Sequence, residues 1–527
     1  MSLSRLAARW FPRLSQKISP PTTPPPTSRI QPRPVMDTIP QSVGQSAETA
    51  TAITTASTAT NTTVNYTTWD TASLISRIQT LESSLAEARS LIPAPKPGQP
   101  RRPLRQIDSS KHTTRLIAIK FAYLGQHYGG YEFHGNDTSL PTVEETLFLA
   151  LLKSRLVTAL PGADPESITA WPGDEAASYS KCGRTDKGVS AFGQVVGVRV
   201  RSTRPTDPEK LAEWDEVRDE MPYTQILNRL LPHSIRVLSW APNPPADFSA
   251  RFNCRARHYR YFFTNPMLSP QTPNGKLDIE AMKLAASYFI GDHDFRNFCK
   301  LDASKQIENF NRVILHASIE KVEDGAVADS YYFDLRGSAF LWHQVRHMMA
   351  VLFLVGQGHE APEVVKEMLD LNIYPTKPAY EMADDRPLVL WDCVFPEEEL
   401  KWVAADEEGV RGALADTTWM GWHEKKIDLI LAEGLVGLVE EVLNKRDAQQ
   451  QADFRTVKKR VRQKEGHVLI LGSGEPVQRG KYVKMVERKR MRPVGEINKA
   501  YLERKGDWRE KRERKRKAQE EAERMEE

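Results

Sequence analysis

The stretch Ser-Lys-Cys-Gly-Arg-Thr-Asp-Lys-Gly-Val-Ser-Ala-Phe-Gly-Gln occupies positions 180–194 and carries the strongest signal in the chain. It places one carboxylate, Asp186, between the cations Arg184 and Lys187 in a glycine-bracketed turn, and an alternating run of valines follows. Neighbouring positive charge keeps a carboxylate ionised, and a strand after the turn fixes its direction. The pattern favours an attacking carboxylate. The alternative is an ordinary turn in which the aspartate caps its own backbone.

Composition limits the class of protein. The chain has 527 residues, of which 40% are hydrophobic and 27% charged, so we expect a soluble protein with a substantial core. Its four cysteines form no Cys-x-x-Cys pair, which is ordinary thiol use in a reducing compartment. No apolar run is long enough to cross a bilayer, so no membrane association is predicted.

The chain divides into four regions by composition. Residues 1–110 are rich in Pro, Ser and Thr and are predicted to be disordered, apart from a short helix at 70–90. Residues 111–245 and 246–403 form the two parts of a folded body. Residues 404–527 are predicted as a helical, basic extension, because 23 Lys and Arg against 8 Asp and Glu lie between Arg455 and Lys517.

The first 36 residues contain several arginines and no acidic residue. This composition is typical of a mitochondrial presequence, and Met36 offers a second start. A basic tail without a targeting role is the alternative.

The folded body alternates strand and helix signals. Strands are predicted at 116–123, 195–201, 259–264 and 331–335, and helices at 223–231 and 341–355. Two more helices are indicated by a capping box at 142–145 and by Asp278 as an N-cap. The order lacks the regular alternation of a doubly wound sheet. We therefore predict an α+β fold of two related halves, with antiparallel or mixed sheets and helices on one face.

Positions 247–263 interleave arginines with aromatic residues along a predicted strand and include Arg251, Arg257 and Tyr259. Such a surface can stack a base and hold the phosphates beside it. An amphipathic core strand with a solvated face is the alternative.

The apolar helix at 341–355 carries only three ionisable residues, His343, Arg346 and His347. A buried guanidinium needs an anionic partner, and we expect that partner to be Asp186. The alternative is an arginine whose charge reaches solvent at the helix edge. The two histidines are four residues apart but lack the glutamate of a zinc protease, so no metal site is predicted.

Residues 181–194 closely resemble the catalytic loop of the TruA-type tRNA pseudouridine synthases, whose core is Gly-Arg-Thr-Asp. The stretches Tyr-Thr-Gln-Ile-Leu-Asn-Arg-Leu-Leu-Pro (223–232), Asp-Phe-Arg-Asn-Phe-Cys-Lys (294–300) and Phe-Leu-Trp-His-Gln-Val-Arg-His-Met-Met (340–349) share the resemblance. It covers roughly residues 111–400, with an echo in the C-terminal region near Lys481–Asn498. It is strongest to the eukaryotic group that acts at tRNA positions 38 and 39, because Gly183 and Ser190 stand where the sister group carries Ala and His.

The resemblance implies the pseudouridine synthase fold, with a catalytic cleft between the halves. It implies that Asp186 is the catalytic aspartate, Tyr259 the active-site tyrosine and Arg346 the arginine that pairs with the aspartate. Substrate contacts are expected from four cations: Arg184, Lys187, Arg251 and Arg257. The partner would be the anticodon stem-loop of tRNA, and relatives are homodimers.

The implied reaction isomerises uridine to pseudouridine without redox change, so no cofactor or metal is expected. Asp186 would attack C1′ or remove a 2′ proton, and both routes stay open. The alternatives are a pseudouridine synthase with other target positions, a non-catalytic tRNA-binding protein, and a sugar-cleaving hydrolase. We expect the protein in the cytoplasm and nucleus, with a mitochondrial pool if the N-terminus is a presequence.

Overall fold

The structure is a computed structural model that describes residues 112–135, 139–268, 275–322, 328–404, 408–453 and 467–506. The predicted disorder of residues 1–110, the helix at 70–90 and the presequence lie outside these residues. No helix in the described ranges is long and apolar enough to cross a membrane.

Within the described residues, the first half of the folded body contains four strands and three α-helices. The strands are β1 (Thr113–Tyr123), β2 (Ser180–Lys181), β3 (Ser190–Ser202) and β4 (Ile235–Ala241). The helices are α3 (Val143–Lys153), α4 (Pro208–Glu213) and α5 (Tyr223–Leu230). The predicted capping box is present, because the Thr142 hydroxyl accepts from the Glu145 backbone while the Glu145 carboxylate accepts from the Thr142 backbone.

The second half contains more strands and a mostly buried helix. Its strands are β5 (Ala256–Asn265), β6 (Gly291–Asp294), β7 (Asn311–Val322), β8 (Asp329–Gly337), β9 (Leu388–Val394) and β10 (Val403–Ala404). Its helices are α6 (Ile279–Ser287), α7 (Gln344–Gly356) and α8 (Val364–Leu369). Asp278 caps α6 as predicted, since its side chain accepts from the Ala281 backbone.

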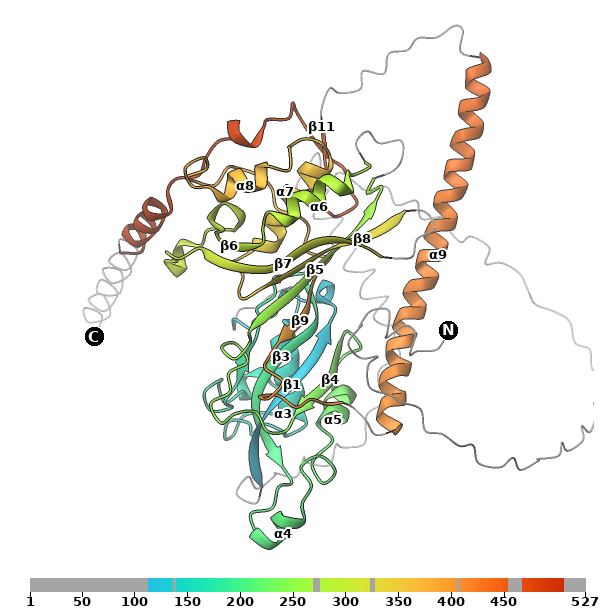
Figure 1. Cartoon of the computed structure of the whole chain (residues 1–527). Coiled ribbons are helices and arrows are strands. Elements are labelled where there is room, and N and C mark those ends of the chain that lie inside the picture. The colour runs from blue at the N-terminus through green and yellow to red at the C-terminus, as the bar shows by residue number, and fades with distance from the viewer. Residues whose placement is uncertain are drawn as a thin grey trace, which may run out of the picture. The chain divides into compact units, whose positions relative to one another are not determined.

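One mixed sheet joins the two halves (Figure 1). Its order is β10-β4-β1-β3-β9-β5-β8-β7-β6, with β2 paired to β3. Neighbouring strands are antiparallel except β3 and β9, which run parallel where Ser190 faces Val389 and Ala191 faces Leu390. The end of β3 that follows the Asp186 loop therefore lies directly at the junction of the halves.

Each half has its own hydrophobic core. The first core packs β1, β3 and β4 against α3 and α5, and the second packs β5, β7 and β8 against α6, α7 and α8. In Figure 1 helices α6, α7 and α8 lie together on one side of strands β5, β7 and β8. Tyr259 packs against both cores, which places it at the boundary. The predicted α+β fold of two halves is confirmed.

The C-terminal region differs from the predicted helical extension. Among the described residues it contains, as predicted, the long helix α9 (Glu408–Asp453) and a helix at 494–506, but the hairpin of β11 (His467–Leu469) and β12 (Val477–Arg479) lies between them in the chain. Ile470 and Met485 are buried in the second core, and the Met491 backbone bonds to the carbonyl of Lys377. Some residues of the segment 467–498 therefore pack into the folded body. Charge composition alone concealed this, because the buried apolar residues are scattered among cations.

Candidate active site

The Asp186 loop is the connection between β2 and β3, and hydrogen bonds hold it at several points. The Gln194 side chain bonds to both the amide and the carbonyl of Gly183, at 3.1 and 2.9 Å. The Thr185 hydroxyl lies 2.6 Å from the buried Tyr123 hydroxyl. The backbone carbonyl of Thr185 accepts a hydrogen bond from the Tyr131 amide at 3.1 Å. The loop is therefore fixed before substrate arrives, which a catalytic group requires.

Gly188 closes the turn in a conformation that other residues rarely adopt. Its φ is +82°, and a Cβ there would lie 2.3 Å from Oδ1 of Asp385. Glycine is required both by the backbone angle and by the close approach of the Asp385 side chain.

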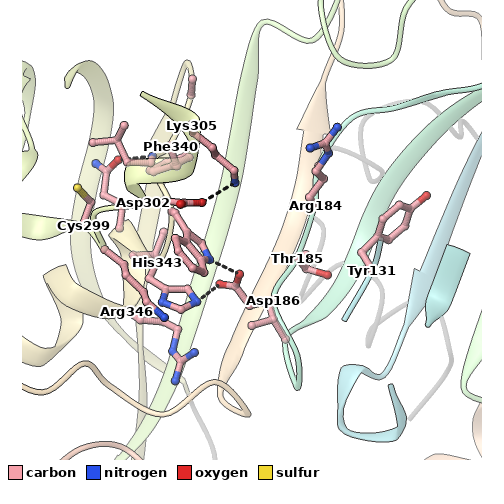
Figure 2. Close-up of a pocket in the computed structure, with 18 of the residues that line it drawn as sticks. Tyr131, Arg184, Thr185, Asp186, Cys299, Asp302, Lys305, Phe340, His343 and Arg346 are labelled. Carbon is pink, nitrogen blue, oxygen red and sulfur yellow. Dashed lines mark hydrogen bonds and ion pairs between the residues drawn. The ribbon is translucent and has the colours of Figure 1, made fainter. Parts of the chain in front are cut away.

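The Asp186 carboxylate is held by two side chains from the other half (Figure 2). The Trp342 indole nitrogen donates to Oδ1 at 3.2 Å, and Nε2 of His343 lies 3.4 Å from Oδ2. These residues immediately precede α7, and His343 has a φ of 58°, in the left-handed region. The carboxylate keeps 26% of its exposure, so it is oriented yet still accessible from the cavity.

The predicted ion pair between Asp186 and Arg346 is wrong. Figure 2 shows the Arg346 guanidinium pointing away from Asp186. Its Nη2 lies 3.6 Å from Oδ2 of Asp385, and its Nε donates to the Ala383 carbonyl at 2.7 Å. Arg346 is buried and does have an anionic partner, as the physical argument required. The partner differs because the loop before β9 brings Asp385 between the guanidinium and the Asp186 turn.

Asp385 connects Arg346 to the catalytic loop indirectly, because its carboxylate also lies against Gly188. Burial raises the pKa of Asp385, and the Arg346 charge opposes that shift. Arg346 thus supports the shape of the Asp186 turn through a second carboxylate.

Tyr259 lies on β5 and lines the same cavity as Asp186. Its ring makes an edge contact with Phe340, with centroids 5.1 Å apart. Burial raises the pKa of Tyr259, and nearby acidic groups, among them Cys393 and Asp186, raise it further. The phenol is therefore neutral at physiological pH.

The cavity has a volume of about 850 Å³ and lies where the two halves meet. Nine Lys and Arg residues line it, against the three carboxylates of Glu132, Asp186 and Asp302. Val494, Ile497 and Asn498 of the C-terminal segment form part of its wall. A cavity of this charge suits a polyanionic substrate.

The four residues predicted to contact substrate all line the cavity, but they differ in how exposed they are and in whether they already have a partner. Arg184 is half exposed and pairs with Glu132 at 3.1 Å, while Lys187 is exposed. Arg251 is exposed and lies over the ring of Phe252, which is 79% exposed.

Arg257 has a structural task that its predicted role as a phosphate contact did not include. Its two terminal nitrogens donate to four backbone carbonyls, those of Cys254, Ser338, Cys182 and Arg251. These bonds use all the terminal N–H groups, so the guanidinium holds loops together in place of a phosphate.

The family comparisons agree with this geometry. A sequence profile described as tRNA pseudouridine synthase matches residues 285–396. The tRNA pseudouridine(38/39) synthase of Saccharomyces cerevisiae is 41% identical over 404 residues, which are 76% of this chain and 81% of the yeast protein. This chain belongs to the TruA-type tRNA pseudouridine synthases. The tRNA pseudouridine(38/39) synthase of Homo sapiens is 43% identical over 58% of this chain and 60% of its own length. The tRNA pseudouridine synthase A of Methanosarcina mazei is 29% identical over 56% and 90%.

A pseudouridine synthase is an isomerase that converts uridine to pseudouridine in tRNA, and the site of this synthase contains the predicted Asp186, Tyr259 and Arg346. Sequence reasoning missed Trp342, His343 and Asp385 as their partners. The signal for the first two was present, because both stand inside the motif at 340–349. Nothing in the local sequence of Asp385 marks it.

Proposed function

We propose that this synthase modifies uridines 38 and 39 in the anticodon stem-loop of tRNA. The support is that its most similar relatives in yeast and mammals are named for these positions. The observation that carries the chemistry is the oriented Asp186 carboxylate, which lies in a cationic cavity beside Tyr259.

Asp186 is proposed as the group that acts on the ribose. With Oδ1 bonded to Trp342 and Oδ2 facing His343, the carboxylate can be directed at C1′ of a flipped nucleotide. A carboxylate at this carbon would attack it or stabilise its developing charge, as in glycoside hydrolysis. Removal of the 2′ proton is the other route, and both routes need the ionised acid.

Tyr259 is proposed to stack on the detached uracil while it turns. Because its pKa is raised, the neutral phenol can assist loss of the C5 proton only as a hydrogen-bonded relay. Tyr259 lines the cavity beside Phe340, which is where the detached base would lie.

Recognition of the RNA is assigned to the exposed part of the cavity. Arg184 and Lys187 flank Asp186 and are placed to contact the phosphates beside the flipped nucleotide. Arg251 and Phe252 form an exposed cation and aromatic pair that suits a second nucleotide.

The test combines a variant with mapping of the product. In cells that lack this protein, carbodiimide mapping of tRNA should show unmodified uridines at positions 38 and 39. The wild-type gene should restore both pseudouridines and Asp186→Asn neither. Full restoration by Asp186→Asn would refute the role of the carboxylate. Restoration at other positions would refute the proposed target.

We also propose that the synthase is a homodimer that associates through α9. This helix carries a stripe of apolar side chains that follows the helical period and is 43–67% exposed: Met420, Ile427, Leu431, Leu435, Leu438 and Val442. A second copy of the same helix is the partner that would cover such a stripe in a symmetric pair.

Light scattering of the full chain should give twice the monomer mass. Leu431→Glu combined with Leu438→Glu should give the monomer, whereas Lys425→Glu combined with Lys426→Glu should leave the dimer. A wild-type monomer at micromolar concentration would refute the proposal.

A location in the cytoplasm and nucleus is also proposed, and the basic N-terminus is the reason for proposing a mitochondrial pool beside it. Fusions that begin at Met1 and at Met36 should differ in mitochondrial signal. Equal distribution of both would exclude a presequence.

A further inference from the structure

Three of the four cysteines converge at the wall of the catalytic cavity. The Sγ atoms of Cys182, Cys254 and Cys393 all lie within 4.8 Å of one another. Each cysteine is less than a tenth exposed. The spacing of the cysteines in the sequence does not reveal this cluster, because the three come from separate segments. Cys182 lies in the Asp186 loop, Cys254 in the segment before β5, and Cys393 in β9.

We propose that these three cysteines bind one thiophilic metal ion, and that the ion is Zn²⁺. A zinc ion bound at about 2.3 Å by thiolates in tetrahedral arrangement places the sulfurs roughly 3.8 Å apart. Small side-chain rotations that shift the sulfur atoms by about 1 Å or less would bring the three cysteines to that geometry. Cys182 and Cys254 line the cavity, which provides a path of entry.

Charge favours a divalent ion such as Zn²⁺ over a monovalent ion at these thiolates. Three thiolates and Zn²⁺ carry one net negative charge, and the Arg257 guanidinium beside them neutralises it. That guanidinium donates to the carbonyls of Cys254 and Cys182, both at 3.3 Å. A monovalent ion such as Cu⁺ would leave the buried site with a net negative charge, which is unfavourable in the interior.

The described residues bring no further His, Cys, Asp or Glu within ligand distance of this cluster. A water or the Ala256 carbonyl, which accepts from the Cys254 thiol at 3.3 Å, would take the fourth position. Binding releases the three thiol protons to solvent and involves no oxidation.

The ion would connect the two catalytic segments. Cys182 stands four residues before Asp186, and Cys254 stands five residues before Tyr259. Cys393 adds the strand that joins the halves. The zinc site would thus position the two catalytic segments. This proposal does not depend on which uridine the synthase modifies.

Elemental analysis of the full-length protein, purified under reducing conditions without chelator, tests the proposal. We expect about one zinc per chain, falling roughly tenfold in Cys182→Ser, Cys254→Ser and Cys393→Ser. Cys299→Ser is the matched control, because this cysteine is 1% exposed in the other core and should leave zinc content unchanged.

Cobalt gives a second measurement that does not depend on the variants folding. Chelator-treated wild-type protein titrated with Co²⁺ should develop the charge-transfer absorption of thiolate ligands, and Zn²⁺ should abolish it. Wild-type protein with no zinc and no such absorption would overturn the proposal. So would equal loss in Cys299→Ser, or a disulfide between two of the three cysteines in the reduced preparation.

Discussion

Trp342→Phe isolates one hydrogen bond to the catalytic carboxylate. The substitution keeps an aromatic ring for Lys300 and Lys305, whose Nζ atoms lie 4.3 and 5.4 Å from the centroid of the Trp342 ring, and it removes the N–H donor to Asp186. A hydrogen bond to a charged group contributes about 1.5–3 kcal/mol. At 3.2 Å, to a carboxylate that is 26% exposed, we take the lower value. It corresponds to a roughly tenfold loss in kcat/KM.

The assay is tritium release from C5 of labelled uridine in a tRNA transcript, measured under single-turnover conditions. Trp171→Phe is the control, because its indole donates to Asp174 at a similar 3.3 Å but does not line the cavity. The control should keep the wild-type rate. A rate for Trp342→Phe within about twofold of wild type would show that this bond does not orient Asp186 during the reaction.

Three other perturbations have expected outcomes. Gly188→Ala forces a Cβ onto Asp385 at a positive φ and should lower the free energy of unfolding by about 1–3 kcal/mol in denaturant, more than Gly135→Ala, whose position is open. Burial lowers the pKa of Lys377 from 10.5 to about 8, so the native state binds that proton more weakly than the unfolded chain. Between pH 8 and pH 10.5 the stability of the wild type relative to Lys377→Met, measured by denaturant unfolding, should therefore rise by about 3 kcal/mol. Arg251→Ala should raise KM for tRNA with kcat retained and reduce the salt slope of binding by about one; an unchanged slope would remove this phosphate contact.

The helices and strands that local patterns predicted in the folded body are present in the structure. The strand predicted at 116–123 lies within β1, the one at 259–264 within β5, and the capping box begins α3 as expected. No strand was predicted after the helix capped by Asp278, yet that helix ends at Ser287 and Gly291–Asp294 forms an edge strand paired with β7. Its pairing partner lies later in the chain, and no local period reveals it.

The amino-acid sequence alone determined the chemical group and its setting. Consecutive residues place a carboxylate between two cations, in a turn that requires glycine and leads into a strand. This arrangement depends only on local geometry. Only the tertiary structure decided what that carboxylate faces. The Trp342 donor and the His343 ring beside Asp186, the Arg346 partner Asp385, and the three clustered thiols each come from segments far apart in the chain. The parallel pairing of β3 with β9 and the start of α7 bring them together, and such long-range packing leaves no periodic trace in a sequence.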